Sequence, residues 1–489
     1  MNAPQAKTVP TLDHWIGGAA VPPAGGQYFD DLNPLDDSLY ARAADGNAAD
    51  VERAVAAADA AFPAFRKLLA KDREALLQKA AALLERDRQD FIDILIDEVG
   101  SPVMKAGFEV GFAIGMLRAA AGVPRRITGQ TLPSDSPERW SLSLREPLGV
   151  VAGITPFNVP MIKVIKQSAM ALACGNTFVN LPSEHAPRLS LRVAKLYEEA
   201  GFPAGSFNVV LGNGAVIGDV LTGHARVKSV TFTGSSVVGR HIAEICAKQL
   251  KKFTLELGGK SPLIVMDDAD LPGAVRAAAM GTFFYQGQAC MASSRILVQR
   301  GIFDRFAQAL AGAAAGLKGG DLRDPGTTLG PIISGRQRKR VETHIADATA
   351  KGARLITGGQ MSGFQCAPTV LTDVTKDMTL YYEETFGPVT TLYPFDTLEE
   401  ALAIANDTPY GLSAAIYTSN INTALQAASG IHTGMVHINA PSLYDEPHVP
   451  FGGVGQSGFG REGTECDLEA MTEWKWVTIQ LPSDAAGHH

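Results

Sequence analysis

The spacing of apolar residues divides the chain into a helical first third and a longer region in which short strands alternate with helices. Apolar residues recur every three or four positions over residues 49–65 and 72–98, with acidic residues near the start of both segments, which predicts two amphipathic helices. From residue 149 onward, short apolar runs alternate with helical patterns. The predicted strand and helix pairs are 149–154 with 159–173, 177–180 with 189–200, 207–210 with 215–221, and 227–233 with 237–249.

A second alternating region follows over residues 261–433. Its predicted helices cover residues 270–284 and 303–315, and its predicted strands cover residues 294–298 and 413–418. Alternation of strands and helices is typical of parallel sheets that have helices on both faces. The pattern therefore predicts an α/β fold.

Two predicted strands lie outside this alternation. Residues 137–147 and 473–481 each alternate apolar with polar positions, and their apolar faces carry Trp140, Trp474 and Trp476. Strand edges with exposed aromatic side chains tend to pair with another strand. We expect these strands to form an arm that pairs with a second copy of the chain.

Composition and charge narrow the class of protein. The chain has 489 residues, of which 46% are hydrophobic, and it carries a net charge of −8. This length predicts roughly two to four domains with sizeable cores. The negative charge argues against a nucleic-acid or anionic-membrane partner, because both need clustered Lys and Arg. The short basic run at residues 338–340 is interpreted as a solvated helix face.

The cysteines and the N-terminal residues bear on the compartment. The cysteines form no CxxC pair and no metal-type spacing with His, so we expect free thiols and no bound metal. Residues 1–15 lack the apolar stretch of a secretory signal, and the most apolar segment, residues 149–162, is too short and too broken by prolines to span a bilayer. We therefore expect a cytoplasmic protein without membrane contact. The cysteines are Cys174, Cys246, Cys290, Cys366 and Cys466.

Three strand ends carry residues suited to chemistry. Gly234 follows the strand at 227–233 and begins a turn into a helix, where free backbone N–H groups favour a phosphate, although such turns occur throughout α/β proteins. Glu256 ends an apolar strand before two glycines, which permit a close backbone approach to a ligand, but it could equally cap the next turn. Asn158 can donate its amide N–H to an oxyanion or form an Asx turn before Pro160.

Cys290 is a candidate nucleophile. Most lone cysteines act as small buried hydrophobes. Here the preceding residues 287–289 are Gly, Gln and Ala, which are small or polar and favour an accessible thiol. A nucleophilic thiol needs a base nearby, and Glu256 is the nearest candidate that ends a strand.

Seven motifs in one order resemble the aldehyde dehydrogenase superfamily over roughly Trp15 to Leu481. The spacing of 34 residues between Glu256 and Cys290 adds to this resemblance. The motifs are Thr-Pro-Phe-Asn at 155–158, Pro-Ser-Glu at 182–184, Phe-Thr-Gly-Ser at 232–235, Glu-Leu-Gly-Gly-Lys at 256–260, Gly-Gln-Ala-Cys at 287–290, Glu-Glu-Thr-Phe-Gly-Pro-Val at 383–389, and the glycine-rich segment 450–462.

The resemblance implies an NAD(P)-dependent, hydrolytic enzyme that oxidises an aldehyde to the carboxylic acid. Cys290 would attack the aldehyde as a thiolate, while the Asn158 amide and the Cys290 backbone N–H would hold the oxyanion. Hydride would then pass to the nicotinamide. Glu256 would activate the water that hydrolyses the resulting thioester.

The resemblance also implies a set of cofactor residues. Gly234 and Ser235 would face the pyrophosphate, and Glu384 and Phe386 would hold the nicotinamide ribose and ring. Glu184 would accept hydrogen bonds from the adenosine ribose, where a carboxylate repels a 2′-phosphate, so NAD is expected rather than NADP. The implied cofactor residues are Thr155, Pro156, Phe157, Ser183, Glu184, Gly214, Gly234, Ser235, Val238, Leu257, Gly258, Glu384 and Phe386.

The same resemblance divides the chain into domains. Residues 1–125 and 147–257 would form a Rossmann-type NAD-binding domain, and residues 258–465 would form an α/β catalytic domain. Residues 126–146 and 466–489 would form the β-strand arm and tail of a homodimer or homotetramer. The partners implied are thus an aldehyde and a second copy of the chain.

Three positions depart from the usual pattern of the superfamily. Leu181 replaces a common Lys and removes a cation from the ribose site, which disfavours NADP further, and Gln167 replaces a Lys found in many members. Lys166 stands where many members carry Trp, and a basic residue there is similar to the branch that oxidises benzaldehyde, vanillin and salicylaldehyde. Lys166 would meet a phenolate or ring substituent, or else point to solvent. The expected apolar channel for the substrate consists of Val159, Met161, Ile162, Met291 and Phe459, with Lys166 beside it.

Three other functions remain as alternatives. A CoA-acylating aldehyde dehydrogenase would not need the water-activating carboxylate of Glu256. A non-catalytic protein on the same fold would need none of Cys290, Glu256, Asn158 and Glu384. A thiol esterase without a nicotinamide would leave Glu384 and the Gly234 turn without a task.

Overall fold

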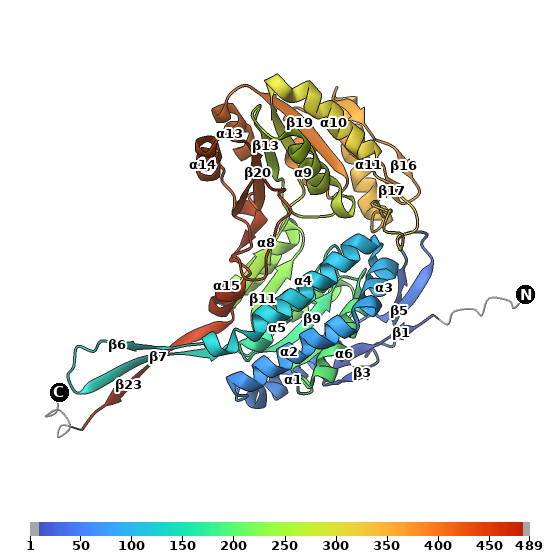
Figure 1. The fold of residues 1–489 in the computed structure, drawn as a ribbon. Helices are drawn as coiled ribbons and strands as arrows, with labels where there is room; N and C mark the ends of the chain where they lie inside the picture. The colour runs from blue at the N-terminus through green and yellow to red at the C-terminus, as the bar shows by residue number, and fades with distance from the viewer. Residues whose placement is uncertain (1–8, 483–489) are drawn as a thin grey trace, which may run out of the picture.

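The computed structural model describes residues 9–482, which fold around two large sheets with a long arm projecting from one side (Figure 1). Residues 1–8, at the start of the predicted first domain, and residues 483–489, at the end of the predicted tail, lie outside the described residues. Each large sheet has a separate cluster of buried apolar side chains on each of its two faces. The α/β fold with parallel sheets is therefore confirmed.

The first sheet has eight strands, and five central strands (β12, β11, β8, β9 and β10) are parallel. The carboxyl ends of these five strands meet at one edge of the sheet. In spatial order the strands are β22 (Gly458–Phe459), β12 (Lys252–Glu256), β11 (Val227–Thr233), β8 (Val150–Thr155), β9 (Thr177–Pro182), β10 (Phe207–Val209), β2 (His14–Ile16) and β3 (Ala19–Val21).

The second sheet has seven strands, all parallel except for the antiparallel pair β15 and β18. In spatial order they are β15 (Arg354–Thr357), β18 (Thr369–Thr372), β19 (Val389–Phe395), β14 (Arg295–Gln299), β13 (Pro262–Val265), β20 (Ser413–Tyr417) and β21 (Met435–Ile438). There are also two small sheets. One contains β1 (Thr11–Leu12), β5 (Leu39–Ala44) and β4 (Tyr28–Leu32) in this spatial order, and the other pairs β16 (Met361–Ser362) with β17 (Gln365–Cys366).

Helices fill both faces of the two sheets. Over the first sheet and beside it lie α1 (Ala48–Phe65), α2 (Ala70–Arg86), α3 (Arg88–Val99), α4 (Val103–Ala121), α5 (Pro160–Ala173), α6 (Pro187–Ala200), α7 (Gly214–Gly223) and α8 (Ser236–Lys248). The later helices are α9 (Leu271–Phe283), α10 (Phe303–Ala315), α11 (Gly335–Ala350), α12 (Thr379–Tyr382), α13 (Leu398–Asn406), α14 (Ile421–Gly430) and α15 (Thr464–Ala470).

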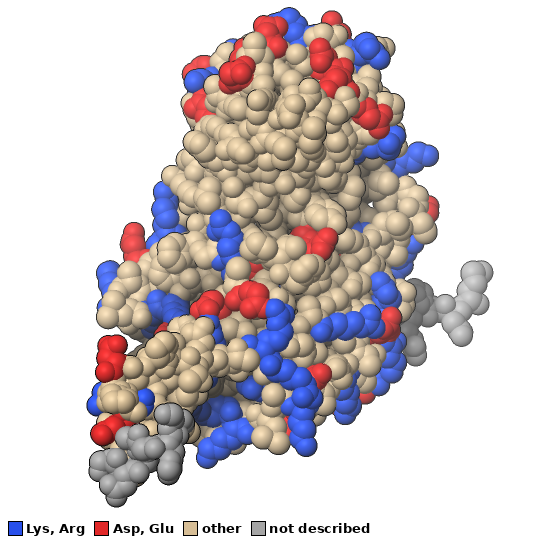
Figure 2. Space-filling view, turned by 60° about the vertical axis from the view of Figure 1, so that its left-hand side comes forward, with Lys and Arg blue, Asp and Glu red and all other residues tan. Residues whose placement is uncertain are grey.

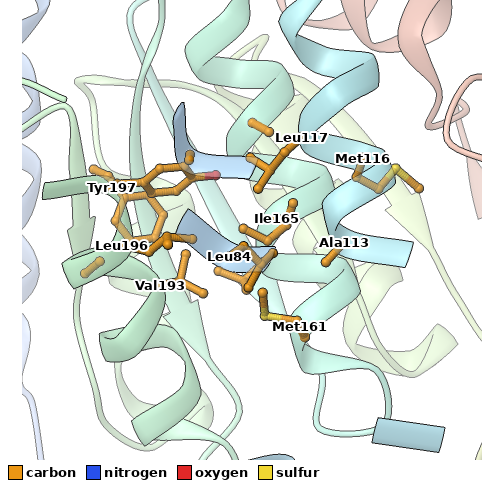
Figure 3. Packing of buried hydrophobic residues seen from close by; sticks show 14 of the residues in the cluster. Leu84, Ala113, Met116, Leu117, Met161, Ile165, Val193, Leu196 and Tyr197 are labelled. Carbon is orange, nitrogen blue, oxygen red and sulfur yellow. The ribbon is translucent and has the colours of Figure 1, made fainter. Parts of the chain in front are cut away.

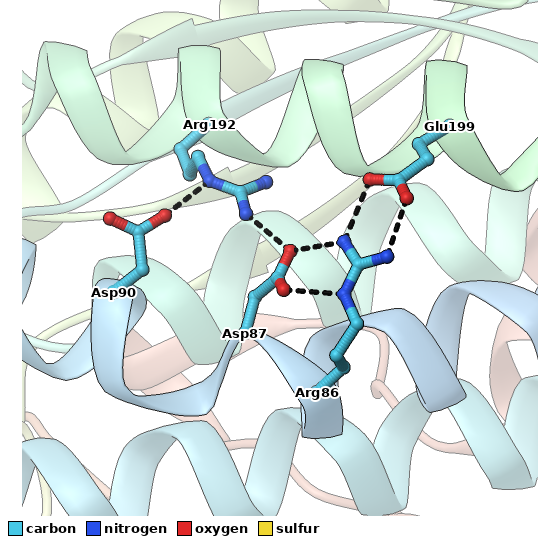
Figure 4. A network of polar contacts seen from close by, with 5 residues as sticks. All are labelled: Arg86, Asp87, Asp90, Arg192 and Glu199. Atoms are coloured by element: carbon cyan, nitrogen blue, oxygen red, sulfur yellow. Dashed lines mark hydrogen bonds and ion pairs between the residues drawn. The ribbon is translucent and has the colours of Figure 1, made fainter.

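The prediction of one long helix over residues 72–98 is wrong, because the chain bends at Asp87 between α2 and α3. The Asp87 carboxylate accepts hydrogen bonds from Arg86 at 2.6 Å and from Arg192 of α6 at 2.5 Å, and Arg86 also contacts Glu199 (Figure 4). These bonds lower the pKa of Asp87 to about 2. The contacts at the break therefore include partners from α6, which the local apolar pattern does not contain.

The core on one face of the first sheet is formed by α2, α4, α5 and α6. Leu84 of α2 and Tyr197 of α6 meet there with Leu117 of α4 (Figure 3). Met161 and Ile165 of α5 complete the cluster. Helix α4 is central to this core and packs against α2, α3 and α5. Within the described residues, α4 and the turn after it form the one helix that is long and apolar enough to cross a membrane, and 56% of that window is buried inside the fold.

The arm is a three-stranded antiparallel sheet of β6 (Gln130–Leu132), β7 (Arg139–Pro147) and β23 (Thr472–Gln480). The two predicted alternating strands thus pair with each other. Trp140, Trp474 and Trp476 are 57%, 46% and 69% exposed. Pairing of this arm with a second copy stays a prediction. The residue-level domain boundaries also stay predictions, although β22, from the predicted catalytic segment, pairs with β12 of the first sheet.

Charged side chains are spread over the face of the molecule shown in Figure 2. Basic side chains are most frequent on the lower part of that face, where acidic side chains lie among them. The described residues contain no group of three or more His, Cys, Asp or Glu side chains arranged to hold a metal ion.

Candidate active site

A cavity of about 170 Å³ lies between the carboxyl ends of three first-sheet strands and loops of the second half of the chain. Strand β8 leads to Asn158, β11 to Gly234, and β12 ends at Glu256, so their parallel order brings all three to the same edge. The lining residues are Pro156, Phe157, Asn158, Val159, Lys163, Thr233, Gly234, Ser235, Glu256, Leu257, Gly258, Cys290, Gln337, Arg340, Glu384 and Phe386.

The three residues predicted to carry the chemistry therefore face one cavity, together with eight of the predicted cofactor residues and one predicted channel residue, Val159. The other predicted residues lie outside the lining. Thr155 is buried at the end of β8, and Ser183 and Glu184 follow β9. The remainder are Gly214 and Val238 in the first turns of α7 and α8, Met161 and Ile162 in α5, Met291 beside the thiol, Lys166 and Phe459.

Phe459 and Lys166 lie outside the lining of the cavity. Phe459 is 60% exposed in the edge strand β22, where its ring packs on that of Phe253 with centroids 4.9 Å apart. Lys166 does not point to solvent, because its side chain is 2% exposed, and its Nζ lies 3.0 Å from Oδ2 of Asp445. Its ammonium is thus already neutralised by a carboxylate of this chain.

Cys290 is held by a strained turn. Tyr285, Gln286 and Gly287 have positive φ angles of 48°, 55° and 65°, a backbone conformation that residues other than glycine rarely adopt. A Cβ at Gly287 would lie 2.1 Å from the carbonyl oxygen of Gly387, so this turn packs directly against the loop that carries Glu384 and Phe386. The turn therefore fixes the thiol relative to that second loop.

The Cys290 thiol is half-buried. Burial raises its pKa to about 12, the nearby carboxyls of Glu384 and Glu256 raise it as well, and the ammonium of Lys163 opposes this rise. The thiol is thus protonated at neutral pH in this arrangement. A nucleophilic role requires a neighbouring group that accepts its proton.

Glu256, a buried carboxyl that lines the same cavity, is the candidate acceptor for this proton. Among the described residues, neither of its carboxyl oxygens has a hydrogen-bond partner, and burial raises its pKa well above the usual value. A Cβ on Gly452 would lie 2.6 Å from Oε1 of Glu256, so the glycine-rich segment 450–462 leaves room for this carboxyl. Buried polar atoms without partners are rare in proteins, and at active sites they are available for substrate or water.

Two lysines of α5 extend the charged surroundings of Glu256. Lys163, which lines the cavity, donates to Oε2 of Glu462 at 2.7 Å, and Lys166 lies 3.6 Å from the same oxygen. Both ammonium groups lie over the ring of Phe451, at 4.9 and 4.4 Å. Burial disfavours ionisation of Glu462, but the two lysines prevail and lower its pKa. Lys163 also raises the fraction of ionised Glu256 through its charge.

Glu384 faces the cavity from the opposite side. Its Oε1 accepts a hydrogen bond from the Gly259 N–H at 3.0 Å, and a Cβ on Gly258 would reach its Oε2 at 2.4 Å. Burial raises the pKa of Glu384 to about 7. Gly258 therefore leaves room for this second carboxyl, whereas a Cβ on Gly259 would lie 2.3 Å from the carbonyl oxygen of Cys290.

Three residues that line the cavity, Lys163, Gln337 and Arg340, were not expected there from the sequence. Gln337 donates to the carbonyl oxygens of Thr385 and Phe386 at 2.9 and 2.8 Å, and Arg340 donates to that of Glu384. The basic run at 338–340 is thus not merely a solvated helix face. The one feature of the sequence that pointed to this run was its position in the second region of alternating strands and helices.

A dinucleotide fits this arrangement on two observations. The first turn of α8 is open, with Val237 and Val238 69% and 46% exposed, and helix N-termini of this kind bind phosphate. Phe386 has a positive φ of 55° and packs edge-on against Phe157 at 5.9 Å, which presents two rings at the cavity. The fold and the site thus define an α/β protein with a cysteine, an unpartnered carboxyl and an amide facing a ligand cavity at a sheet edge.

Comparison with known proteins gives the family. Residues 21–477 match the aldehyde dehydrogenase family, and the chain belongs to it. It is 41% identical to a vanillin dehydrogenase of Pseudomonas fluorescens over 95% of this chain and 97% of that protein, and 37% identical to an NADP⁺-dependent succinate-semialdehyde dehydrogenase of Escherichia coli over 95% and 97%. The crystal structure of an NAD-dependent aldehyde dehydrogenase from Sinorhizobium meliloti superposes with a TM-score of 0.94 at 37% identity, covering 96% of this chain and 95% of that one.

Proposed function

We propose that this aldehyde dehydrogenase oxidises an aromatic aldehyde to the carboxylic acid with NAD, through a thiohemiacetal and a thioester on Cys290. The observation that carries the proposal is the single cavity that Cys290, Glu256 and Asn158 share with Glu384 and Phe386. A thiol esterase or a non-catalytic protein would have no use for this combination.

In the first step the Cys290 sulfur bonds to the carbonyl carbon of the aldehyde. Because burial raises the pKa of the thiol to about 12, its proton must pass to a base, and the unpartnered carboxyl of Glu256 is suited to receive it. The oxyanion that forms accepts hydrogen bonds from the Asn158 amide and from the Cys290 backbone N–H. Such donors act strongly in a buried site, and Asn158 is only 5% exposed.

The residues that would hold the cofactor are Ser235 at the pyrophosphate, Glu384 and Phe386 at the nicotinamide, and Ser183 and Glu184 at the adenosine ribose. NAD, when bound, accepts the hydride that leaves the carbonyl carbon. The exposed carboxylate of Glu184 would repel a 2′-phosphate, and Leu181 is buried in the core and supplies no cation, so NAD is preferred over NADP.

In the last step water adds to the thioester, and the Cys290 sulfur leaves as the carboxylic acid is released. Glu256 takes the proton from this water, for which it must be ionised and so must first release the thiol proton to solvent. Lys163 favours this ionisation, because its ammonium opposes the effect of burial on the Glu256 pKa. A CoA-acylating enzyme would need no such base, so Glu256 favours hydrolysis.

The aromatic substrate is supported by the 41% identity to a vanillin dehydrogenase and by the basic residue at position 166. Since the Lys166 ammonium is held by Asp445 and Glu462, a direct contact with a phenolate would require it to leave both carboxylates. A carboxylate-bearing aliphatic aldehyde is the second candidate, favoured by the similarity to a succinate-semialdehyde dehydrogenase. We also propose that the arm joins two copies of the chain.

The test is the absorbance of reduced nicotinamide with NAD or NADP and a panel of benzaldehyde, vanillin, acetaldehyde and succinate semialdehyde. We expect the fastest reduction with NAD and the aromatic aldehydes, and none with Cys290→Ala. Faster turnover of succinate semialdehyde would overturn the aromatic assignment and keep the mechanism. Activity that persists in Cys290→Ala would overturn the mechanism itself.

A further inference from the structure

Helix α4 carries a buried ion pair that the proposed chemistry does not use. Lys105 and Glu109, one turn apart, are 2% and 0% exposed and form a salt bridge. The Lys105 Nζ also donates to Oγ of Ser101 at 3.1 Å. A buried ion pair costs desolvation that its mutual attraction seldom exceeds, so its presence calls for a role other than stability alone.

On one side this pair holds the helix that follows Asn158. Oε1 of Glu109 accepts the backbone N–H of Met161 at 2.8 Å and lies 3.4 Å from that of Ile162. Helix α5 has no cap from its own N-cap residue, because the side chain of Val159 accepts no hydrogen bond. The first turn of α5, directly after Asn158, is therefore capped from α4.

On the other side the pair holds the turn that leads to Cys290. The Lys105 Nζ lies 4.0 Å from the centroid of the Tyr285 ring, a cation–π contact, and the Tyr285 hydroxyl donates to the Val99 carbonyl at 2.7 Å. One turn along α4, the ring of Phe108 meets that of Phe284 edge-on at 6.0 Å. Helix α4 thus contacts both residues that begin the strained turn.

We propose that Lys105 and Glu109 are positioning residues, which fix Asn158 and Cys290 relative to each other across α4. The proposal rests on the proposed roles of Asn158 and Cys290. Asn158 and Cys290 are 132 positions apart in the chain and are carried by different sheets, so a shared attachment to one helix keeps the oxyanion donors in register. Catalytic geometry is sensitive at this level, since a displacement of about 1 Å can reduce turnover roughly a hundredfold.

A second buried glutamate provides a matched control. Glu98, at the end of α3, accepts the backbone N–H groups of Arg188 at 2.5 Å and Leu189 at 3.1 Å, and so caps α6 as Glu109 caps α5. Ala186, the N-cap residue of α6, likewise provides no side-chain cap. Glu98 is 1% exposed, but α6 bears none of the residues assigned to the chemistry.

The experiment compares Glu109→Leu, Lys105→Met, the double variant and Glu98→Leu in the full-length enzyme, since leucine has no acceptor for the backbone N–H groups. Each single variant leaves a buried group mismatched, so its Tm should fall by several degrees. The double variant removes both charges and should recover most of the Tm. If the pair positions the site, kcat falls about ten- to a hundredfold in all three α4 variants, whereas the KM for NAD changes less than about twofold.

The contrast between Tm and kcat decides the outcome. A kcat that recovers together with the Tm in the double variant, or that falls equally in Glu98→Leu, would show a merely structural role and overturn the proposal. Phe108→Ala is a further variant whose folding is not at risk, because the ring is 54% exposed, and a kcat below that of the wild type is expected there too.

A readout without turnover separates this proposal from the proposed function. The rate at which iodoacetamide alkylates Cys290, followed by mass spectrometry of its peptide, should change in Lys105→Met and stay at the wild-type rate in Glu98→Leu. This holds whichever aldehyde is oxidised. Equal alkylation rates in the wild type and in Lys105→Met would contradict positioning of the thiol, even if the enzyme oxidises every aldehyde tested.

Discussion

The two walls of the active-site cavity are built differently. The first wall consists of strand ends of one parallel sheet, where Asn158, Gly234 and Glu256 are placed by the register of β8, β11 and β12. The second wall consists of loops, in which Cys290 and Glu384 are placed by positive φ angles and by loop-to-loop contacts.

The difference separates two requirements of the reaction. In the proposed mechanism the sheet wall carries the oxyanion donor and the base, which must stay still, and a fully buried parallel sheet is rigid. The loop wall carries the proposed nucleophile, Cys290, which follows the strained turn at residues 285–287. We therefore expect substitutions in the sheet wall to remove chemical steps and substitutions in the loop wall to affect stability and activity together.

The largest effect is expected for Glu256→Gln in the sheet wall. Loss of a general base typically costs a factor of about 10² to 10⁴, so steady-state turnover should fall in that range. If Glu256 acts mainly on the water, one equivalent of reduced nicotinamide per site still forms in a rapid burst. Rapid mixing with NAD and the best aldehyde measures this burst, and unchanged steady-state turnover would contradict the assignment.

Asn158→Ala should have the next largest effect. Removal of one oxyanion donor costs about 2.7–4 kcal/mol, so kcat should fall on the order of a hundred- to a thousandfold. Because the donor acts on the transition state, the KM for NAD should change little. The matched variant Asn158→Asp keeps the size of the side chain but places a negative charge beside the oxyanion, and full turnover in either variant would refute the role.

Gly287→Ala tests the loop wall. A side chain at φ +65° costs about 1–2 kcal/mol in backbone strain, and the contact with Gly387 adds to it, so the free energy of unfolding should fall by about 2–3 kcal/mol with a simultaneous loss of activity. Gly26→Ala is the control, because Gly26 has nearly the same φ of +66° and nothing within 4 Å of the added Cβ. Denaturant unfolding should show a smaller loss there and full activity.

Lys163→Met should have the smallest effect and should appear as a shift in pH dependence. The ammonium lowers the pKa of both Glu256 and Cys290, so its removal raises both. The acidic limb of the kcat/KM profile should move to higher pH by about one unit, which reduces the rate on that limb about tenfold. Lys163→Arg keeps the charge and should keep the profile in place, and a shift to lower pH in Lys163→Met would contradict the sign.

The sheet wall could largely be predicted from the sequence. The strand at 227–233 and the helix at 303–315 have the predicted bounds, because their apolar periods reflect which face is buried locally. The order of motifs placed Glu256, Asn158 and Cys290 at one site before any geometry was known. Their catalytic roles themselves await the experiments above.

Contacts between distant segments could not be predicted in this way. Lys163 pairs with Glu462, 299 positions later, and Asp87 at the break between α2 and α3 binds Arg192 from α6. Lys166 was expected either beside the substrate channel or in solvent. It does not lie in solvent, because it is buried and paired with a carboxylate from residue 445. No local pattern encodes such pairings.

The arm has a practical consequence for measurement in solution. The chain has four tryptophans, and three of them, Trp140, Trp474 and Trp476, lie exposed on the arm, while Trp15 is buried in the core. Intrinsic fluorescence therefore reports mainly the surroundings of the arm. A blue shift of the emission as the protein is concentrated would record water leaving these indole rings, and it would do so without any label.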